Sequence, residues 1–325
     1  MSDRAKLAIW GVGNLGSRYI QGLAHTPTPI DIFAFDPLKG SEAKMTNLFP
    51  PPSSTSHSLS FVKNESDIPS SLDVAVISTN SDVRFAIVRR LLETSHVKHL
   101  ILEKVVFQRL SDYKIIEGLL KEKETKCWVN HPRRVLEFYK NLKMLLADQT
   151  PLYMSVMGGG WGLASNTLHL ADLFSYISGS HNLDFNMSIE DTLLPDKRSS
   201  SFFEIEGVIK IKSELNHCVI GCMKDVVPAQ ISFFTPDYIC HVKESEGLLE
   251  IQRRDNDWAT EKKCENIIKY QSQITADIVQ DLVSNDHCDL PTYSQVLPYH
   301  MSYIKTLGNR LFSDDFSDDT PVTIT

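Results

Sequence analysis

A glycine-rich turn joins a strand pattern to a helix pattern near the N-terminus, and it limits the possible folds of this chain more than any other segment. Residues 6–10 form a short apolar run that predicts a buried strand, and residues 15–24 carry apolar side chains at helical spacing. Between them the sequence reads Gly11-Val12-Gly13-Asn14-Leu15-Gly16, which has the spacing G-x-G-x-x-G. A strand that turns this tightly into a helix is typical of the first βαβ unit of a Rossmann fold.

Each glycine has a physical task in such a turn. Gly11 permits the sharp turn, Gly13 lets the backbone approach a ligand, and Gly16 lets the helix pack against the strand. The backbone N–H groups at Asn14 and Leu15, at the positive end of the helix dipole, can bind a diphosphate. The turn therefore predicts a dinucleotide site. The alternative is a strand–turn–helix whose glycines serve packing alone.

An acidic residue ends the second predicted strand, residues 31–35. Asp36 follows Gly16 by about twenty residues, where a carboxylate can accept hydrogen bonds from the adenosine ribose and would repel a 2′-phosphate. We therefore expect NAD in preference to NADP, although Lys39 and Ser41 nearby could accommodate a phosphate. In the alternative, Asp36 is only the N-cap of the next helix.

The pattern of predicted elements changes near residues 130–132. Before that point apolar strand runs alternate with helix patterns, which predicts a parallel sheet covered on both faces. Beyond it, strands follow one another without helices between them, which predicts an antiparallel sheet. We expect an α/β fold in two parts: a doubly wound Rossmann domain over residues 1–130, and an α+β domain with a largely antiparallel open sheet over residues 131–325.

Three local predictions are specific enough to be checked. The Pro- and Ser-rich residues 50–60 are expected to form a loop. Residues 202–212 are expected to form one long strand. The acidic residues 313–319 are expected to fray.

Composition argues against several classes of protein. With 33 basic and 41 acidic side chains the net charge is −8, which disfavours binding to nucleic acid or to an anionic membrane. No apolar run has the length of a membrane span and no secretory signal precedes the first strand, so we expect a cytoplasmic protein. Of the six cysteines only Cys218 and Cys222 lie close together, which favours free thiols and argues against a metal site.

Four segments resemble the Gfo/Idh/MocA family of oxidoreductases, named for glucose–fructose oxidoreductase and inositol dehydrogenase. They are the glycine turn, the segment 74–80 that ends in Ser78-Thr79-Asn80, the pair Glu103-Lys104, and the glycines 158–160 followed by His169-Leu170-Ala171-Asp172. Residues 130–134 and 290–293 add a weaker similarity. The combination is specific to the family, whereas no single segment is.

The resemblance implies how these residues would serve a nicotinamide cofactor. Ser78, Thr79 and Asn80 would line the nicotinamide side of the cleft, and Glu103 and Lys104 would adjoin it. Lys104 would also contact the substrate. The resemblance further implies that the open face of the second sheet forms a homodimer or homotetramer contact.

The chain departs from the family pattern at three positions. Val105 replaces the proline that follows Glu-Lys in the family motif, and Arg84 stands where many members carry histidine. Ser165 occupies the position four residues before His169, which is acidic in many sugar and inositol dehydrogenases. This last departure affects the residues expected to move a proton.

Hydride removal from a secondary alcohol needs a group that takes the hydroxyl proton. His169 suits this role because an imidazole titrates near neutral pH, and Asp172 at i+3 could orient it. Lys104 follows a predicted strand, at the edge where open α/β sheets bind ligands, and could donate to the substrate oxygen or act as a base. The alternatives are a buried helix histidine, a surface aspartate and a solvated lysine.

Three further side chains are candidates for the substrate pocket. Trp161 and Asn166 flank the histidine helix, although Asn166 could instead be its N-cap. Arg133, like its neighbour Arg134, could bind an anionic group or begin a helix from its solvated face.

These residues together predict NAD(P)-dependent hydride transfer between the nicotinamide and a secondary alcohol or ketone of a sugar, an inositol or a related polyol. Lys104 and His169 would handle the proton, and a small molecule would be the partner. Two alternatives stay open. One is an imine- or tetrapyrrole-reducing enzyme on the same scaffold, which Ser165 favours. The other is an NAD(P)-binding sensor or subunit without turnover.

Overall fold

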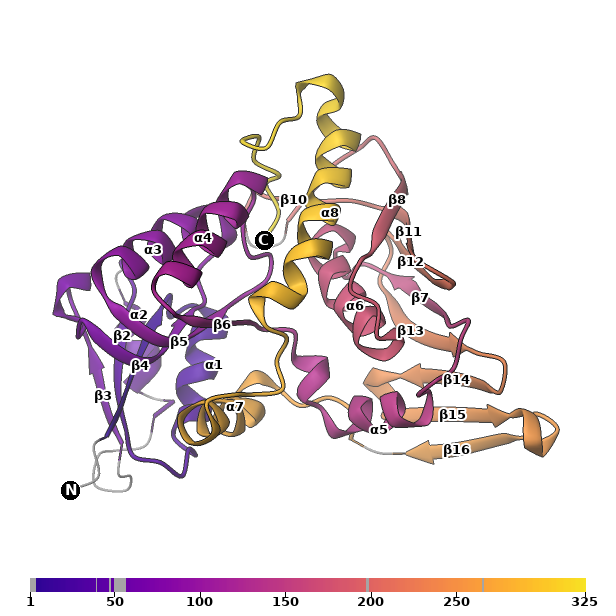
Figure 1. Cartoon of the computed structure of the whole chain (residues 1–325), viewed down its shortest axis with the longest axis horizontal. Coiled ribbons are helices and arrows are strands. Elements are labelled where there is room, and N and C mark those ends of the chain that lie inside the picture. The colour runs from indigo at the N-terminus through magenta and orange to yellow at the C-terminus, as the bar shows by residue number, and fades with distance from the viewer. Residues whose placement is uncertain (1–3, 39, 47, 50–56, 197–198, 265) are drawn as a thin grey trace. The chain divides into compact units, whose positions relative to one another are not determined.

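The chain forms two compact units in the computed structural model, which describes residues 4–38, 40–46, 48–49, 57–196, 199–264 and 266–325 (Figure 1). Within that range the first unit contains residues 4–107, 112–132 and 269–293. The second contains residues 108–111, 133–268 and 294–325. The chain passes between the units next to the predicted boundary, but residues 269–293, which the pattern assigns to the second domain, pack within the first.

The first unit is built on a six-stranded sheet in which every neighbouring pair is parallel. Its strand order is β3-β2-β1-β4-β5-β6. The strands are β1 (Ala5–Trp10), β2 (Ile30–Phe35), β3 (Ser58–Phe61), β4 (Ser71–Ile77), β5 (His96–Leu102) and β6 (Lys126–Val129). The order reverses between β1 and β4, and ligands of doubly wound sheets bind at such a reversal. The predicted Rossmann sheet is confirmed.

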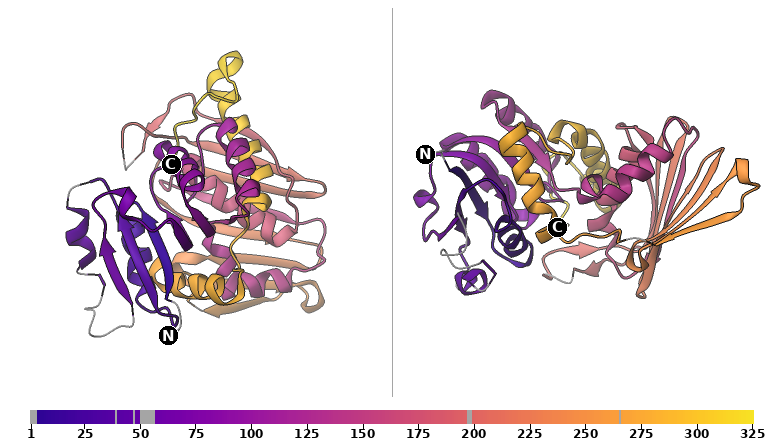
Figure 2. Two further views of the ribbon diagram at one scale, coloured as in Figure 1. Left: turned by 60° about the vertical axis from the view of Figure 1, so that its left-hand side comes forward. Right: turned by 90° about the horizontal axis from the view of Figure 1, so that it is seen from below.

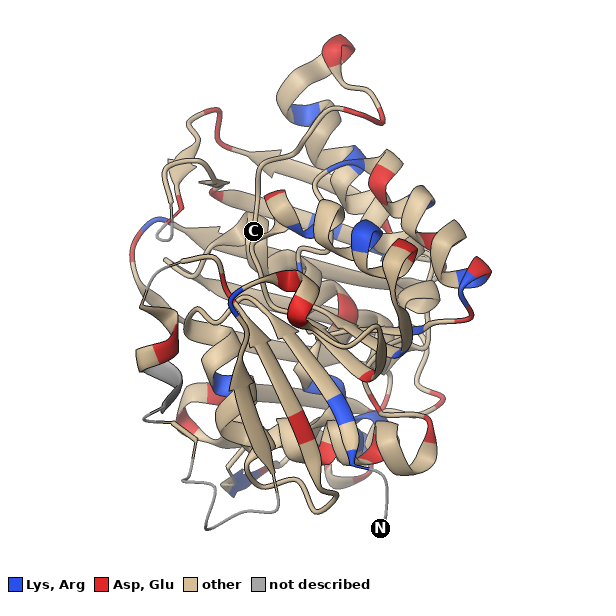
Figure 3. Cartoon of the chain, turned by 90° about the vertical axis from the view of Figure 1, so that its left-hand side faces the viewer, with Lys and Arg blue, Asp and Glu red and all other residues tan. Residues whose placement is uncertain are grey.

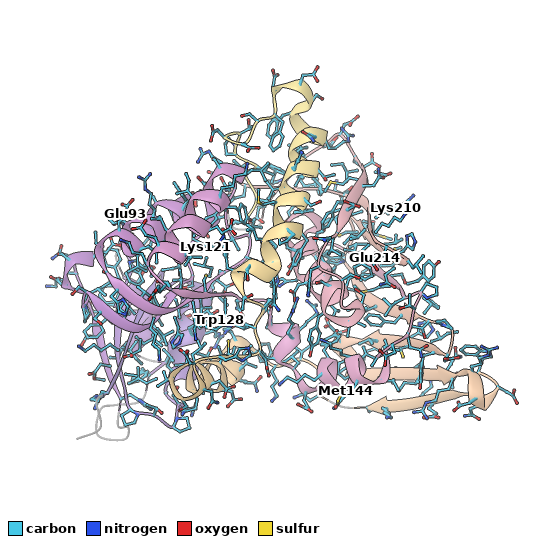
Figure 4. All side chains as sticks on the ribbon, viewed as in Figure 1. Glu93, Lys121, Trp128, Met144, Lys210 and Glu214 are labelled. Carbon is cyan, nitrogen blue, oxygen red and sulfur yellow. The ribbon has the colours of Figure 1, made fainter. Side chains whose placement is uncertain are left out.

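Helices and apolar side chains close the first unit around this sheet. The helices are α1 (Asn14–Leu23), α2 (Ser41–Thr46), α3 (Ser81–Thr94), α4 (Leu110–Glu122) and α7 (Gln271–Asn285). Trp128 on β6 is buried, whereas Glu93 on α3 and Lys121 on α4 are exposed (Figure 4). Acidic and basic residues are interspersed over the helices and loops of this unit (Figure 3).

Helix α7 belongs to the first unit because it packs against α1 (Figure 1). A Cβ added to Gly22 of α1 would lie only 2.7 Å from Cβ of Thr275, so the two helices cross in close contact at this glycine. Ile274 and Ile278 of α7 are buried. The apolar face of α7 therefore packs against α1, which lies far from it in the sequence. The pattern of neighbouring segments does not predict this contact.

The predicted loop over residues 50–60 is wrong at its end. Ser58–Phe61 is a strand that pairs in parallel with β2. The strand is short, at the edge of the sheet, and two of its four residues are serine, so it carries no clear strand pattern. Residues 50–56 lie outside the described residues.

The second unit contains an eight-stranded sheet in the order β16-β15-β14-β13-β7-β12-β11-β8. The strands are β7 (Tyr153–Gly159), β8 (Asp184–Ile189), β11 (Gly207–Ser213), β12 (Asn216–Met223), β13 (Val227–Phe234), β14 (Tyr238–Lys243), β15 (Leu248–Arg253) and β16 (Thr260–Cys264). Neighbours are antiparallel except β7 and β12, which are parallel. The predicted largely antiparallel sheet is confirmed.

Helices α5 (Glu137–Leu145), α6 (Leu163–Ser178) and α8 (Tyr293–Phe312) lie on one face of this second sheet (Figure 2). The predicted strand over residues 202–212 is two strands, because β10 (Phe203–Glu204) pairs with β9 (Leu194–Pro195) before β11 begins at Gly207. Gly207 has φ +123°, where the chain leaves one strand for the other.

The acidic C-terminal segment does not fray. The N–H of Ser111 donates to the carbonyl of Asp318 at 3.0 Å, and Nε of Arg109 donates to that of Asp319 at 2.9 Å. Beyond it Val322 and Ile324 are fully buried in the same unit. Apolar side chains after the acidic run therefore anchor a segment whose own composition favours solvent. Over the residues described, the structure contains no helix long and apolar enough to traverse a lipid bilayer.

Candidate functional site

The glycine turn joins β1 to α1 in the first unit. Gly11 has φ +86°, and a Cβ added there would lie 3.0 Å from the backbone N of Thr79. A Cβ added to Gly16 would lie 1.9 Å from the carbonyl oxygen of Gly11. The start of α1 thus packs directly on the end of β1, and a side chain at either glycine would displace it.

Gly13 has no such packing role. Its φ of −68° suits any residue, and no described atom lies within 4 Å of a Cβ added to it. Gly13 and Asn14 are exposed at the N-terminus of α1. The N-cap residue is Gly13, which has no side chain to cap the helix. Backbone N–H groups of a first helical turn, left open in this way, are the groups that bind a diphosphate. The residues of the turn, Leu15 included, therefore fit a dinucleotide.

Asp36 holds the glycine turn from the end of β2. Its Oδ2 accepts from the N–H of Val12 at 2.6 Å, and its Oδ1 accepts from the N–H of Leu38 at 2.8 Å. Each carboxylate oxygen keeps a further acceptor site, so the residue can still receive ribose hydroxyls. Because α2 begins only at Ser41, Asp36 is not its N-cap. Lys39 lies outside the described residues.

The segment after β4 lies beside the same turn. The Ser78 hydroxyl donates to the carbonyl of Gly11 at 2.7 Å and so helps to hold the turn. The Thr79 hydroxyl oxygen is buried without a hydrogen-bond partner among the described residues. Asn80 is exposed, and its side chain makes no capping bond to α3. Thr79 and Asn80 are therefore placed to contact a ligand at this edge of the sheet.

Arg84 of α3 fastens two loops at this edge, and sequence reasoning did not predict that role. The side chain is 1 % exposed. Its guanidinium donates to the carbonyl of Glu103 at 2.8 Å and also to the carbonyls of Thr79 and Val105. The buried Arg84 guanidinium therefore ties together the loops after β4 and β5.

Glu103 and Lys104 end β5. The Oε1 atom of Glu103 accepts from the Tyr19 hydroxyl at 2.7 Å and from Nδ2 of Asn130 at 2.6 Å. Burial raises the pKa of the Glu103 carboxyl, an effect that these two hydrogen bonds and the charge of Arg84 oppose. Lys104 is 8 % exposed, and its peptide bond to Val105 is cis. Because Glu103 is engaged within the protein, we assign it to holding the loop.

In the second unit a carboxylate from a distant strand caps α6. Oε2 of Glu204 accepts from the N–H of Ala164 at 2.7 Å, and both carboxylate oxygens lie 3.3 Å from the N–H of Ser165. A negative charge is favourable at this end of a helix. The structure thus places an acid beside Ser165, although the first turn of the helix carries none. Glu204 was missed because it lies 40 residues from Ala164, and no spacing rule links them.

The N-cap of α6 is Gly162, so the alternative that Asn166 caps this helix is wrong. Nδ2 of Asn166 donates to the carbonyl of Gly162 at 3.1 Å and to that of Trp161. The amide group therefore holds the loop that precedes the helix. Trp161 is half-buried in that loop.

Asp172 is fully buried on α6 and is engaged by two other elements. Nε of Arg134 lies 2.9 Å from each carboxylate oxygen, and the Tyr299 hydroxyl donates to Oδ1 at 2.7 Å. This ion pair fastens α6 to the segment Pro132–Val135 and to α8. His169 is half-buried on the same helix. The Asp172 carboxylate is engaged by Arg134 and Tyr299. We therefore do not assign Asp172 the predicted role of orienting the His169 imidazole.

Arg133 is likewise engaged within the second unit. Its Nε and Nη2 atoms each lie 2.8 Å from an oxygen of Glu244, and the Tyr139 hydroxyl donates to the same carboxylate. A guanidinium in this bidentate pair offers no free fork to an anion. We therefore do not retain Arg133 as a substrate-binding residue.

A pocket of about 280 Å³ opens at the start of α6. Its lining includes the predicted Trp161 and Asn166 together with Ser165, Glu204, Glu206 and Lys224. The structure thus gathers the predicted cofactor residues at one edge of the first sheet, and two predicted substrate residues around one pocket of the second unit. Lys104 belongs to the first unit and His169 to the second.

Residues 5–131 match the family model GFO_IDH_MocA, described as "Oxidoreductase family, NAD-binding Rossmann fold". A comparison with curated proteins finds no match. Solved structures share the fold along nearly the whole chain. One is an oxidoreductase from Agrobacterium radiobacter in complex with NAD+, L-tartaric acid and magnesium, at 11 % identity and a TM-score of 0.69, covering 93 % of this chain and 95 % of that one.

Two further solved structures show how widely this fold is used. UDP-N-acetylglucosamine 3-dehydrogenase GnnA from Acidithiobacillus ferrooxidans is 13 % identical with a TM-score of 0.65, covering 94 % of this chain and 97 % of that one. A super-repressor mutant of Gal80p from Saccharomyces cerevisiae is 13 % identical with a TM-score of 0.69, covering 94 % and 95 %. The family match confirms the resemblance drawn from the sequence: residues 5–131 are an NAD-binding Rossmann domain of the Gfo/Idh/MocA oxidoreductase family.

Proposed function

We propose that this chain is an NAD-dependent dehydrogenase that transfers hydride between the nicotinamide and a secondary alcohol or ketone of a sugar, an inositol or a related polyol. The observation that carries the proposal is the open start of α1, where Gly13 has no packing neighbour while Gly11 and Gly16 are tightly packed. Packing within the protein does not explain a glycine at position 13, whereas the close approach of a bound diphosphate does.

In this proposal the first unit binds and orients the cofactor. The N–H groups at Asn14 and Leu15 bind the diphosphate, and Asp36 accepts the ribose hydroxyls. Thr79 and Asn80 contact the nicotinamide end. When bound, NAD supplies the hydride acceptor. The charge of Asp36 disfavours the 2′-phosphate of NADP, which supports NAD as the preferred cofactor.

Lys104 and His169 move the substrate proton in this proposal. As hydride leaves the carbinol carbon, the hydroxyl proton must also leave, and a positioned base lowers the barrier. The His169 imidazole can take that proton, and the Lys104 ammonium can donate a hydrogen bond to a substrate oxygen. Support for His169 comes from its helix, which also carries the pocket residues Ser165 and Asn166.

A titration of NAD+ into two matched variants tests the proposal. Gly13→Ala and Gly118→Ala each add one methyl group to a glycine with nothing within 4 Å. We expect NAD+ to bind Gly13→Ala at least about tenfold more weakly, about 1.4 kcal/mol, and to bind Gly118→Ala like the wild type. If the wild type binds neither pyridine nucleotide, the proposal is wrong. Reduction of NAD+ by members of a polyol and sugar panel then tests the reaction itself.

A second candidate is an NAD-binding regulatory subunit without turnover. It is favoured by Ser165 in place of the family acid and by the engagement of Asp172 with Arg134. The structural likeness to a Gal80p super-repressor mutant also supports it. This candidate predicts NAD+ binding with no oxidation of any panel member, and unchanged NAD+ affinity in Lys104→Ala. Turnover that is lost in Lys104→Ala and His169→Ala would reject it.

A further inference from the structure

Lys104 lies in a segment that one buried arginine holds on both sides of the lysine. Nη1 of Arg84 donates to the carbonyl of Glu103 at 2.8 Å, to that of Val106 at 3.2 Å and also to that of Val105. Val105 and Val106 are fully buried, so their backbone carbonyls need a partner inside the protein. The backbone before and after Lys104 therefore curves around the Arg84 guanidinium.

The same guanidinium also reaches the loop after β4. Nη2 of Arg84 donates to the carbonyl of Thr79. A guanidinium is planar and its N–H groups point in fixed directions, so the carbonyls that it joins keep a fixed relative position. The backbone at Lys104 is therefore held at a set place relative to the loop that contacts the nicotinamide end in the proposed function.

A buried carboxylate balances these positive charges. Glu103 is buried, and burial raises the pKa of its carboxyl, while the charges of Arg84 and Lys104 are among the effects that oppose this rise. A buried cation is costly unless an opposite charge lies nearby. Glu103 therefore supplies a countercharge for both cations.

Glu103 is itself held by side chains from two other elements. Its Oε1 accepts from the hydroxyl of Tyr19 on α1 at 2.7 Å and from Nδ2 of Asn130, next to the end of β6, at 2.6 Å. Nδ2 of Asn130 also donates to Oε1 of Gln271, the first residue of α7, at 2.9 Å. Hydrogen bonds in a buried site are stronger than in water and restrict the groups that they join. The helix that begins at the open glycine turn thus helps to fix the carboxylate next to Lys104 in the sequence.

We propose that Arg84 is a positioning residue for Lys104, with Glu103 as the countercharge of both. This inference deepens the proposed function and rests on it, because there Lys104 contacts the substrate. Arg84 does not touch the substrate and acts only by keeping the lysine in one place relative to the nicotinamide. A misplacement of about 1 Å in a reacting group can cost roughly a hundredfold in rate, so such positioning has a measurable effect on turnover.

Nuclear magnetic resonance of the full chain tests the positioning without any reaction. Lysine labelled with ¹³C at Cε gives one signal for each lysine, and the Lys104 signal is the one that disappears in Lys104→Met. We expect Arg84→Met to shift or broaden the Lys104 signal and Arg89→Met to leave it unchanged. Arg89 is the matched control because it is exposed on the same helix, α3.

A milder variant keeps the test valid if Arg84→Met does not fold. Tyr19→Phe keeps the buried ring and removes only the hydroxyl that donates to Glu103. It should also shift the Lys104 signal, by less than Arg84→Met does. Tyr153→Phe, at an exposed position in the second unit, is its control. An unchanged Lys104 signal in Tyr19→Phe and in any folded Arg84→Met overturns the proposal.

Turnover of a substrate from the polyol and sugar panel gives a second test. Arg84→Met should lower kcat roughly 10- to 100-fold. Its NAD+ affinity should change by less than about threefold, because the glycine turn and Asp36 are untouched. In the Lys104→Met background, loss of Arg84 should lower kcat no further, since positioning acts only through the lysine. Equal losses in both backgrounds would show that Arg84 only supports the fold, and would overturn the proposal.

The two measurements separate this inference from the proposed function. A shifted Lys104 signal in a chain that binds NAD+ but oxidises no panel member keeps the positioning of the lysine and rejects the dehydrogenase. Turnover that is lost in Lys104→Met but unchanged in Arg84→Met rejects the positioning alone.

Discussion

Two helices of this chain start in similar ways, but the backbone N–H groups at their N-termini are left open in one and capped in the other. Both α1 and α6 follow a strand and a glycine-rich turn, and both have glycine as N-cap, Gly13 and Gly162. The start of α1 is open, whereas the start of α6 is closed by the carboxylate of Glu204. A helix N-terminus is therefore an anion site only where the rest of the fold does not supply its own anion.

The two helices also differ in how the rest of the protein holds them. Helix α1 packs along its length on α7 through the close approach at Gly22. Helix α6 is held by a fully buried carboxylate, Asp172, paired with Arg134. The first arrangement depends on shape and the second on charge, and this difference sets the order of the effects expected below.

The largest effect is expected at the buried ion pair of α6. Asp172→Ala leaves the Arg134 guanidinium buried without its partner, which should lower the free energy of unfolding by about 3–5 kcal/mol. Urea denaturation measures the loss. The double variant Arg134→Met/Asp172→Leu replaces both charges by apolar groups and should recover most of it. A single variant as stable as the wild type would show that charge does not hold this helix.

At the open helix, Asp36→Ser should weaken NAD+ by about 1.5–3 kcal/mol, roughly ten- to a hundredfold, because hydrogen bonds to a charged group are lost. NADP+ should lose far less, since the repulsion of its 2′-phosphate disappears as well. Asp36→Asn is the control for charge: it keeps one oxygen, which can accept from the N–H of Val12, and its amide nitrogen replaces the oxygen that accepts from Leu38. Equal losses for both nucleotides, measured by titration, would refute the ribose assignment.

Removal of the cap should make α6 resemble α1. Glu204→Ala leaves the N–H groups of Ala164 and Ser165 without their acceptor and should lower stability by about 1–2 kcal/mol. Inorganic phosphate should then raise the melting temperature of Glu204→Ala more than that of the wild type, because the freed N–H groups can bind it. A melting temperature equally insensitive to phosphate in both proteins would contradict the comparison of the two helix starts.

The smallest effect on stability is expected at the C-terminal end of α7. There Oδ1 of Asp286 lies 2.6 Å from Nε2 of His99, and the Asp286 carboxylate also forms an ion pair with Lys126. Hydrogen bonds from Lys126 and His99 lower the pKa of the Asp286 carboxyl. Its contribution to stability is therefore present above the unfolded pKa of about 3.9 and is lost as the pH falls toward the lower folded pKa.

Because the Asp286 side chain is 43 % exposed, solvent screening should limit this contribution to about 1 kcal/mol or less. Asp286→Asn should reduce stability at pH 7 and converge with the wild type below pH 4, measured as urea midpoints across pH. A difference that persists undiminished at acid pH would point to lost packing instead of lost charge.

The sequence predicts those site residues that are close together in the chain, and those that follow neighbouring strands of the parallel sheet. The glycine turn is continuous, and Asp36 and Thr79 follow strands that flank β1, so their meeting at one edge follows from the parallel topology. Arg84 and Glu204 could not be assigned in the same way. Each contacts loops or helix ends that lie elsewhere along the chain, and no periodicity encodes such pairs.

The Rossmann domain, its glycine turn and its family could be predicted from the sequence, because these depend on local spacing and on the alternation of strands and helices. Three outcomes follow from the folded structure and not from local pattern: α7 packs in the first unit, Asp172 pairs with Arg134, and Glu204 caps the start of α6. These outcomes depend on which buried charges and apolar faces meet across the chain, and burial is a property of the folded whole.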